Sequence, residues 1–239
     1  MSDLITLFGV TLKSSESDLL FDNFSLSIQK GELVLLWGPG GSGKSTLFQI
    51  LTGTMNPDHG EVIVNGKNIL HFSRKEWTAY RRSIGFVPQN EPLLKDRSVF
   101  EEIELPLELD GVNSARRKKQ VHAILERFHL QEVQDQYPAL LSMSERERLA
   151  IARAVVREPL ILLADEPAAH LNAEGMRDIV SILKQENLRG MTILLGTADE
   201  RFASSFPGAR ICSLLDLGHS KWTETNSSLP VRMSVNVLD

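Results

Sequence analysis

A glycine-rich run between residues 38 and 45 has the residue types and spacing that bind phosphate. It reads Gly38, Pro39, Gly40, Gly41, Ser42, Gly43, Lys44 and Ser45, which matches G-x-x-x-x-G-K-[ST]. Glycines let backbone N–H groups turn toward phosphate oxygens, and a following helix adds the positive end of its dipole. We expect Lys44 to reach the β and γ phosphates and the Ser45 hydroxyl to ligate Mg²⁺. The run predicts an ATP site that includes Thr46; a turn that binds nothing is the weaker alternative.

Two carboxylates follow a second apolar run, at residues 160–164. These are Asp165 and Glu166, and an apolar strand that ends in acids delivers them to the sheet edge where a phosphate ligand binds. We expect Asp165 to hold Mg²⁺ through water and Glu166, the catalytic candidate, to orient or deprotonate the attacking water. The alternative is two acids that end a strand and face solvent, which the neighbouring phosphate motif makes less favoured.

The elements that must position these groups follow from the hydrophobic pattern. Short apolar runs typical of buried strands alternate with helical spacing, which indicates an α/β core with a parallel sheet. The strand runs are residues 33–37, 84–87, 160–164 and 192–195, and the helical ones are 44–51 and 176–186. The first thirty residues alternate as antiparallel strands do, residues 61–64 end at the hairpin signal Asn65-Gly66, and residues 99–154 have helical spacing.

Composition narrows the class of protein. The chain has 239 residues, enough for one large domain with a core that needs no metal or disulfide, and a single cysteine, Cys212, which we expect to be buried. The formal net charge of −5 argues against nucleic acid as a partner. We find neither a signal segment nor a run of apolar residues long enough to span a membrane. Residues 145–148 alternate in charge and are expected to form weak surface ion pairs.

A third motif gives the sequence a family resemblance. Residues 138–155 read PALLSMSERERLAIARAV, and together with the phosphate loop, Gln89 and Asp165-Glu166-Pro167 they resemble the ATPase subunits of ABC transporters. The resemblance implies a P-loop NTPase (RecA-like) parallel-sheet core with an antiparallel β subdomain and an inserted helical subdomain. It implies one ATPase domain over residues 1–218, with core segments 1–92 and 155–218, a helical subdomain at about 93–154, and a tail at 219–239 that we interpret as weakly ordered or peripheral.

The resemblance also implies roles for particular residues. Gln89 corresponds to the glutamine that senses Mg²⁺ and links the site to a membrane partner, so the implied metal ligands are Ser45, Gln89 and Asp165. The signature segment, defined here as Ser142, Met143, Ser144 and Glu145, corresponds to the motif that closes over the γ-phosphate of ATP on an opposite subunit. The family therefore implies a dimer, of identical or different chains, that sandwiches two ATP molecules.

Residues 88–99 and 104–107 are most similar to one branch of this family. That branch includes the cell-division protein FtsE, the lipoprotein-release ATPase and the macrolide-exporter ATPase, and the run Asp96-Arg97-Ser98-Val99 is most similar to FtsE. An FtsE-like output is mechanical signalling across the membrane; the other members imply extraction of a lipid-anchored or small substrate.

Four positions depart from the family pattern. Met143 and Ser144 replace signature glycines, and Ala198 stands where the family has a histidine that contacts the γ-phosphate. Asn172 replaces an aspartate, and near Ser14 no aromatic residue offers an adenine platform, for which Phe21 is the substitute we consider. Loss of one charge-stabilising group costs a factor of about 10²–10³ in rate. The residues that hold ATP are complete, whereas those that close the site are altered.

The resemblance therefore implies a peripheral subunit on the cytoplasmic face of the inner or plasma membrane, with an integral, permease-like partner that it moves. We expect this subunit to bind ATP well and to hydrolyse it slowly. The alternatives are a non-hydrolysing, ATP-gated regulatory or scaffold subunit, the degenerate half of a heterodimeric exporter or lipoprotein-release system, and an ordinary ATPase that tolerates these substitutions. A soluble relative of DNA repair or translation is disfavoured, because such proteins carry coiled-coil insertions or a second cassette.

Overall fold

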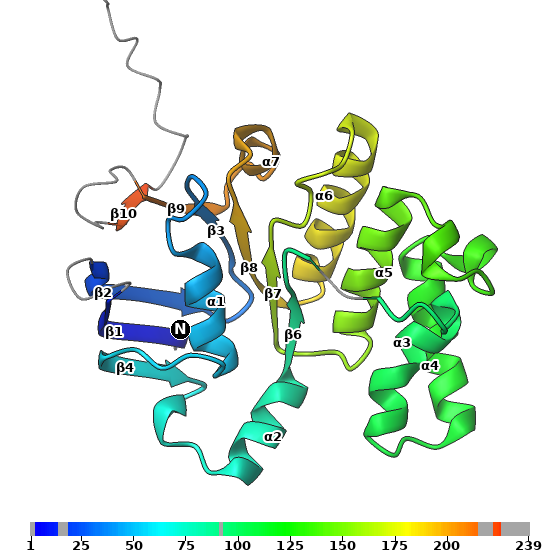
Figure 1. The fold of residues 1–239 in the computed structure, drawn as a ribbon, viewed down its shortest axis with the longest axis horizontal. Helices are drawn as coiled ribbons and strands as arrows, with labels where there is room; N and C mark the ends of the chain where they lie inside the picture. Colours follow the sequence, from blue (N-terminus) through cyan, green and yellow to red (C-terminus); the bar gives the residue numbers. More distant parts are fainter. Residues whose placement is uncertain (1–2, 14–18, 91–92, 215–221, 226–239) are drawn as a thin grey trace, which may run out of the picture.

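The structure is a computed structural model that describes residues 3–13, 19–90, 93–214 and 222–225. Figure 1 shows an antiparallel sheet at one side, a mainly parallel sheet in the middle and a group of helices at the other side. The antiparallel sheet has the order β2-β1-β4-β5. Its strands are β1 (Asp3–Lys13), β2 (Leu19–Gln29), β4 (His59–Val64) and β5 (Lys67–Asn68).

The central sheet has the order β10-β9-β3-β8-β7-β6, and its strands are parallel except for β10. The strands are β3 (Leu33–Trp37), β6 (Ile84–Val87), β7 (Ile161–Asp165), β8 (Thr192–Thr197), β9 (Arg210–Leu214) and β10 (Trp222–Thr225). Every residue of β7 and β8 is buried, as expected for parallel strands covered on both faces. The predicted class, an α/β core with a parallel sheet plus an antiparallel sheet, is confirmed.

Helices cover the two faces of the central sheet. They are α1 (Lys44–Thr52), α2 (Arg74–Ser83), α3 (Val99–Leu109), α4 (Ser114–Arg127), α5 (Met143–Val155), α6 (Ala173–Leu188) and α7 (Glu200–Ser204). Three short 3-10 helices are η1 (Ile69–His71), η2 (Gln131–Val133) and η3 (Pro138–Leu140). Helices α3, α4 and α5 are inserted in the chain between β6 and β7, where the sequence predicted helices (Figure 1).

Alternate residues of the strands supply two hydrophobic cores. Val34 and Leu36 of β3 point into one core, which α1 and the antiparallel sheet complete. Leu35 of the same strand points to the opposite face, into a core that α6 and the inserted helices share. Because successive residues of a strand point to opposite faces, one face of the central sheet packs on the antiparallel sheet and the other face packs on the inserted helices.

The hairpin predicted at Asn65-Gly66 is confirmed. These two residues join β4 to β5, and both have positive φ, 49° and 74°. A two-residue turn with φ above zero at both positions fits the right-handed twist of the flanking strands. Asparagine and glycine are the residues that adopt this conformation at least cost.

The tail expected after residue 218 contains a strand that the sequence pattern did not predict. The backbone of Trp222–Thr225 forms β10, which pairs antiparallel with β9, so Thr225 lies opposite Ile211. An edge strand joins a sheet through backbone N–H and C=O groups and needs no alternating apolar side chains. The rest of this tail lies outside the described residues.

Candidate functional site

The phosphate motif lies between the carboxyl end of β3 and the first turn of α1. Gly43 is the N-cap of α1 and has φ 92°, a conformation that favours glycine. A Cβ at position 43 would also lie 3.1 Å from the ring of Phe21. The start of the loop is fixed to the sheet, since the Gly38 N–H donates to the Thr197 carbonyl at 3.1 Å. The sequence thus builds a loop with its backbone amides at a helix N-terminus, which suits an anion.

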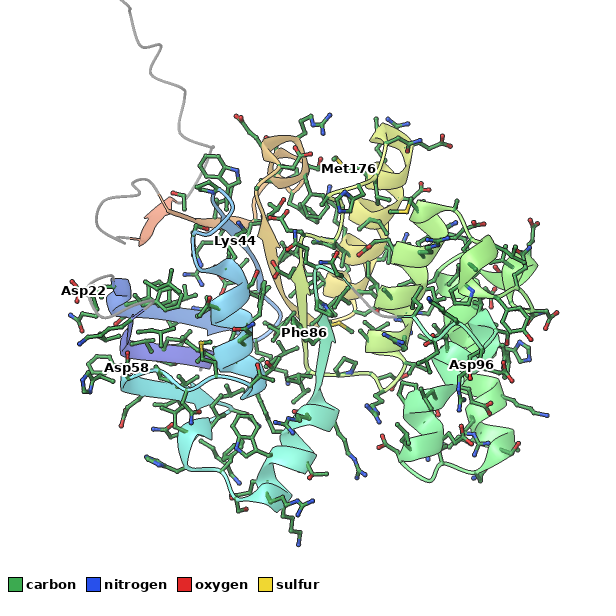
Figure 2. The ribbon with its side chains drawn as sticks, viewed as in Figure 1. Asp22, Lys44, Asp58, Phe86, Asp96 and Met176 are labelled. Carbon is green, nitrogen blue, oxygen red and sulfur yellow. The ribbon has the colours of Figure 1, made fainter. Side chains whose placement is uncertain are left out.

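Lys44 is buried inside this loop. Its Nζ donates to the carbonyl oxygens of Gly38 at 2.7 Å and Pro39 at 3.0 Å, and it lies 3.5 Å from Oε1 of Glu166. Figure 2 shows Lys44 at the start of α1, beside the central sheet. The hydroxyl of Ser42, in the same loop, is buried and has no hydrogen-bond partner among the described residues. A buried donor without a partner fits a loop that awaits phosphate oxygens.

Asp165 ends β7 and lies beneath the loop. It is 4% exposed, and its Oδ1 has no hydrogen-bond partner in the part of the chain that the structure describes. Burial raises the pKa of this carboxyl, the Ser45 hydroxyl opposes that rise, and the charge of Glu166 adds to it. Gly196 of β8 makes room for it, because a Cβ there would lie 3.0 Å from Oδ1. An unpartnered carboxylate oxygen beside a serine hydroxyl fits Mg²⁺, which prefers oxygen ligands.

No set of three or more His, Cys, Asp or Glu side chains forms a metal cluster among the described residues.

Glu166 is held by backbone groups of β8 and the segment after it. It has a positive φ of 53°, and its N–H donates to the Gly196 carbonyl at 2.8 Å. Its Oε2 accepts a hydrogen bond from the Ala198 N–H at 3.1 Å. Ala198 therefore contacts Glu166 through its backbone, and its side chain is only a methyl group.

One cavity of about 250 Å³ collects most of the predicted nucleotide site. Its walls are Leu20, Gly40, Gly41, Ser42, Gly43, Lys44, Ser45, Thr46, Gln89 and Glu166. The predicted residues Gly38, Pro39 and Asp165 lie outside this wall, and the first two accept the hydrogen bonds of Lys44. A larger hollow of about 510 Å³ lies at the amino ends of β3 and β9, but no predicted site residue lines it.

The structure corrects the interpretation of Phe21 as an adenine platform. Phe21 is fully buried and stacks on Phe24, with ring centroids 5.4 Å apart. It supports Gly43 from below and presents no face to a ligand. The neighbouring Leu20, which sequence reasoning missed, is the side chain that lines the cavity. The alternation along β2 could have distinguished Leu20 from Phe21 in the sequence, because adjacent strand residues point to opposite faces of the sheet.

The signature segment lies at the start of α5 and does not line this cavity. Ser142 is the N-cap; its Oγ accepts from the Glu145 N–H at 3.3 Å and donates to Glu145 Oε2 at 2.6 Å. The Ser142 hydroxyl and the Ser142 backbone N–H both donate to the carboxylate of Glu145, and they hold its pKa below its usual value. Met143 is half exposed, whereas Ser144 packs toward Gly175 of α6, where a Cβ would lie 3.2 Å from it. The segment is therefore not part of the wall of the nucleotide cavity of its own chain.

Residues 145–148 form no close ion pair with one another or with any other described residue, although the charge of Arg148 contributes to lowering the pKa of Glu145. Glu145 belongs to the helix cap, and Arg146 donates to the carbonyls of Pro138 at 2.9 Å and Ala139 at 3.1 Å. Burial raises the pKa of Glu147 to about 7. The charges alternate in sequence, but the helix turns them toward different surroundings.

Comparison with known proteins shows the same architecture. A family model described as ABC transporter matches residues 21–169. The chain is 33% identical over 233 residues to the ABC transporter ATP-binding protein YtrE of Bacillus subtilis (strain 168), with 96% of each protein covered. It is 40% identical over 175 residues to the methionine import ATP-binding protein MetN 1 of Rhodopseudomonas palustris, with 73% of this chain and 47% of that protein covered. The chain spans about half the length of that methionine import relative.

Two solved structures share the fold. The cassette MJ0796, described as the dimeric structure of a post-hydrolysis state bound to ADP and Pi, has a TM-score of 0.81 and 30% identity, over 93% of this chain and 98% of that one. The structure of cbiO1 from Clostridium perfringens, described as part of the ABC transporter complex cbiONQ, has a TM-score of 0.84 and 26% identity, over 95% and 89% of the two chains. The predicted P-loop NTPase fold is confirmed.

Proposed function

The chain belongs to the ABC transporter family of ATP-binding proteins, and on that premise we propose that it is an ATP-binding, slowly hydrolysing subunit of a membrane complex. The described residues contain no helix that is long and apolar enough to cross a bilayer. From its membership of this family, we propose that an integral, permease-like partner holds the chain at the cytoplasmic face of the membrane. ATP-driven closure of a cassette dimer moves that partner.

The convergence of Lys44, Asp165 and Glu166 on one loop is the observation that carries this proposal. Lys44 Nζ lies 3.5 Å from Glu166, and Asp165 holds an unpartnered oxygen beneath the same loop. We assign nucleotide binding to Gly38–Thr46 and Gln89, Mg²⁺ binding to Ser45, Gln89 and Asp165, and water activation to Glu166. These are the parts that phosphoryl transfer requires: a cradle, a cation and a group that orients water.

Slow turnover follows from what surrounds Glu166. The Ala198 N–H holds the carboxylate at 3.1 Å, but the methyl side chain has no polar atom to contact a γ-phosphate. Removal of one charge-stabilising donor costs about 10²–10³ in rate. Met143 and Ser144 add side chains at the helix end that is proposed to approach the phosphate of an opposing subunit. Phosphate binds most closely where backbone amides are bare of side chains.

Among family branches we propose an FtsE-like role, which transmits force to the membrane partner. The run Asp96-Arg97-Ser98-Val99 supports it; the adjoining Glu91 and Pro92 lie outside the described residues. The competing proposal is the degenerate half of a heterodimeric exporter or lipoprotein-release system, and the altered signature favours it. A regulatory subunit without turnover is a third form of the same proposal, and Glu166 argues against it.

The first test is ATP turnover by the purified chain with Mg²⁺, with Glu166→Gln as the blank. We expect ATP binding together with a rate that Glu166→Gln abolishes and that is well below about 1 s⁻¹, the lower end of ordinary enzyme rates. A rate of ordinary size would overturn the slow-site proposal. A rate equal to the blank would identify a nucleotide-gated clamp.

A second test restores the missing side chain. Ala198→His is expected to raise kcat by about tenfold or more, because it adds a donor beside Glu166 and the phosphate. Glu200→His places the same residue on the exposed start of α7 and serves as the control. An unchanged kcat in Ala198→His, with ATP still bound, would show that position 198 does not limit the reaction.

A further inference from the structure

A group of basic side chains on α2 and α4 takes no part in the nucleotide site. Helix α2 reads RKEWTAYRRS, and α4 begins SARRKK. Residues 74–82 and 108–119 together carry eight basic and three acidic side chains, a net charge of +5, although the whole chain carries −5. Positive charge is therefore concentrated in one region of an otherwise acidic molecule.

The two helices present this charge at the same side of the molecule. Figure 1 shows α2 and the turn between α3 and α4 at the same lower edge. Arg82 of α2 lies 3.0 Å from Asp110, the C-cap of α3. A hollow of about 400 Å³ lies between these helices, and its wall includes Arg81 and the 70% exposed Leu109. The basic side chains therefore border one surface, with an exposed leucine beside them.

The acidic side chains of this region are engaged within the chain, whereas most of the basic ones are not. Each carboxylate has a partner: Ser73 for Glu76, Arg157 for Asp110 and Arg97 for Glu108. Among the described residues, the exposed basic side chains that form no ion pair here are Arg74, Lys75, Arg81, Arg116, Lys118 and Lys119. We call these six side chains the basic face.

Folding does not explain where these charges lie. Arg74 and Lys75 occupy the first turn of α2, and Arg116 begins the basic run in the first turn of α4, which has no acidic residue. The N-terminus of a helix is the positive end of its dipole, so basic side chains there are unfavourable. Charges that oppose local stability at an exposed surface are typical of a surface that serves a ligand.

We propose that the basic face binds the anionic phospholipid headgroups of a membrane surface, with Leu109 among those headgroups. This rests on the proposed function only in placing the chain at a membrane. Guanidinium and ammonium groups donate to phosphate, and an exposed apolar side chain beside them adds burial at the headgroup level. Six cations spread over two helices match a plane of many phosphates better than they match a single acidic side chain.

Vesicle sedimentation with the purified chain, without nucleotide, tests this binding. Vesicles of phosphatidylcholine mixed with phosphatidylglycerol supply the anionic surface, and vesicles of phosphatidylcholine alone are the uncharged comparison. We expect binding to the anionic vesicles only, at about 0.1 M salt. It should be lost at about 1 M salt, because the screening length falls from about 10 Å to about 3 Å.

The variant Arg116→Gln/Lys118→Gln/Lys119→Gln removes half of the basic face and leaves the nucleotide cavity intact. We expect vesicle binding to weaken by at least about tenfold, because each basic side chain near an anionic surface contributes about fivefold. The melting temperature should stay the same or rise, because position 116 no longer opposes the dipole of α4. A lower melting temperature would show that the fold needs these charges and would overturn the inference. Arg74→Gln/Lys75→Gln, on the other helix, is expected to weaken binding as well.

A matched control removes three basic side chains from other parts of the surface. Lys13→Gln/Lys30→Gln/Arg177→Gln changes exposed residues of β1, of the turn after β2 and of α6, and it lowers the net charge by the same amount. We expect vesicle binding to change by less than about twofold, because charges beyond a screening length from the bilayer contribute little.

The outcomes separate this inference from the function proposed above. Two results would overturn it and leave an acidic protein surface as the partner of the basic face: no binding of the unchanged chain to anionic vesicles, or equal binding to uncharged ones. An equal loss in the control would also overturn it, since net charge alone would then set the attraction. Because none of these measurements uses nucleotide, a failure of ATP binding or turnover would leave the vesicle result unchanged.

Discussion

Lys44 carries the central charge of the site, and its surroundings explain how the loop keeps its shape. Its ammonium group is bonded to two carbonyls of its own loop and lies near Glu166. Phosphate oxygens are stronger acceptors than carbonyls because the bond is charge-assisted on both sides. We therefore expect a nucleotide to compete well for Lys44, and we propose that its arrival frees Glu166 from that cation to act on water.

The half-buried Glu147 makes stability depend on pH. Burial raises its pKa to about 7, above the value of 4.5 in the unfolded chain. The folded chain therefore binds more protons between these values, and stability falls as the pH rises through them. We expect Glu147→Gln to raise the free energy of unfolding by about 1–3 kcal/mol at pH 8 and to change it little near pH 4.5. Urea unfolding at several pH values measures this.

Glu145→Gln on the same helix is the control with the opposite sign. Its pKa is lowered by Ser142, so the stability it contributes is present above 4.5 and is lost as the pH falls through its folded value. Two results would contradict the attribution of the pH dependence to Glu147. One is a lower free energy of unfolding in Glu147→Gln at pH 8, and the other is a free energy of unfolding that varies with pH in this variant as it does in the unchanged chain.

At the scale of elements, α5 is the helix whose placement matters most. It packs on β6 and against α3 and α6, and its first turn is the signature segment. The close approach to β6 depends on Gly85, where a Cβ would lie 2.6 Å from the Ala154 carbonyl oxygen. A missing side chain in a strand thus fixes how near the helix comes to the sheet.

Gly85→Ala is therefore expected to push α5 away from the sheet. A backbone clash in a packed core costs about 1–3 kcal/mol, and we expect a lower melting temperature together with altered hydrogen exchange in α5. Gly40→Ala is the matched control for stability, because its φ is not positive and a Cβ there meets nothing within 4 Å. Equal melting temperatures for the two variants would show that β6 and α5 adjust without strain.

At the scale of the whole molecule, the two parts of the proposed site do not meet within one chain. The nucleotide cavity is lined by residues at the start of α1 and by Glu166 after β7, whereas the signature segment lies at the start of α5 and does not line that cavity. Because one chain carries the nucleotide cavity and the signature segment at separate places, a second cassette is suited to supply the signature segment that completes the site.

We expect Glu166→Gln to convert from one chain to a dimer when ATP and Mg²⁺ are present, since the variant retains the ATP that closes the dimer. Light scattering on a sizing column measures the mass with and without ATP. Chelation of Mg²⁺ by EDTA is expected to return the dimer to single chains, because Asp165 and Ser45 then lack the cation that we propose joins them to phosphate. A single-chain mass despite bound ATP would contradict self-pairing and favour a different cassette as the partner.

Local rules in the sequence determined much of this protein. The spacing of Gly38 to Ser45 requires a loop between a strand and a helix, and the apolar runs at β3, β7 and β8 have the length and composition of buried parallel strands. These features follow from dihedral preferences and periodicity, which act between neighbours in the chain. The order of the elements and the residues proposed to hold ATP were accessible for that reason.

Contacts between distant segments decided the rest. Phe21 proved to be a core residue because the fold lays the phosphate loop over it, and β10 exists because β9 offers a free edge. Glu102 and Glu147 look like ordinary helix-surface acids in sequence, yet one is fully buried and the other titrates near neutral pH. The burial and pairing of a side chain depend on which elements pack together. The hydrophobic period of a strand or helix, two or 3.6 residues, does not say which elements these are.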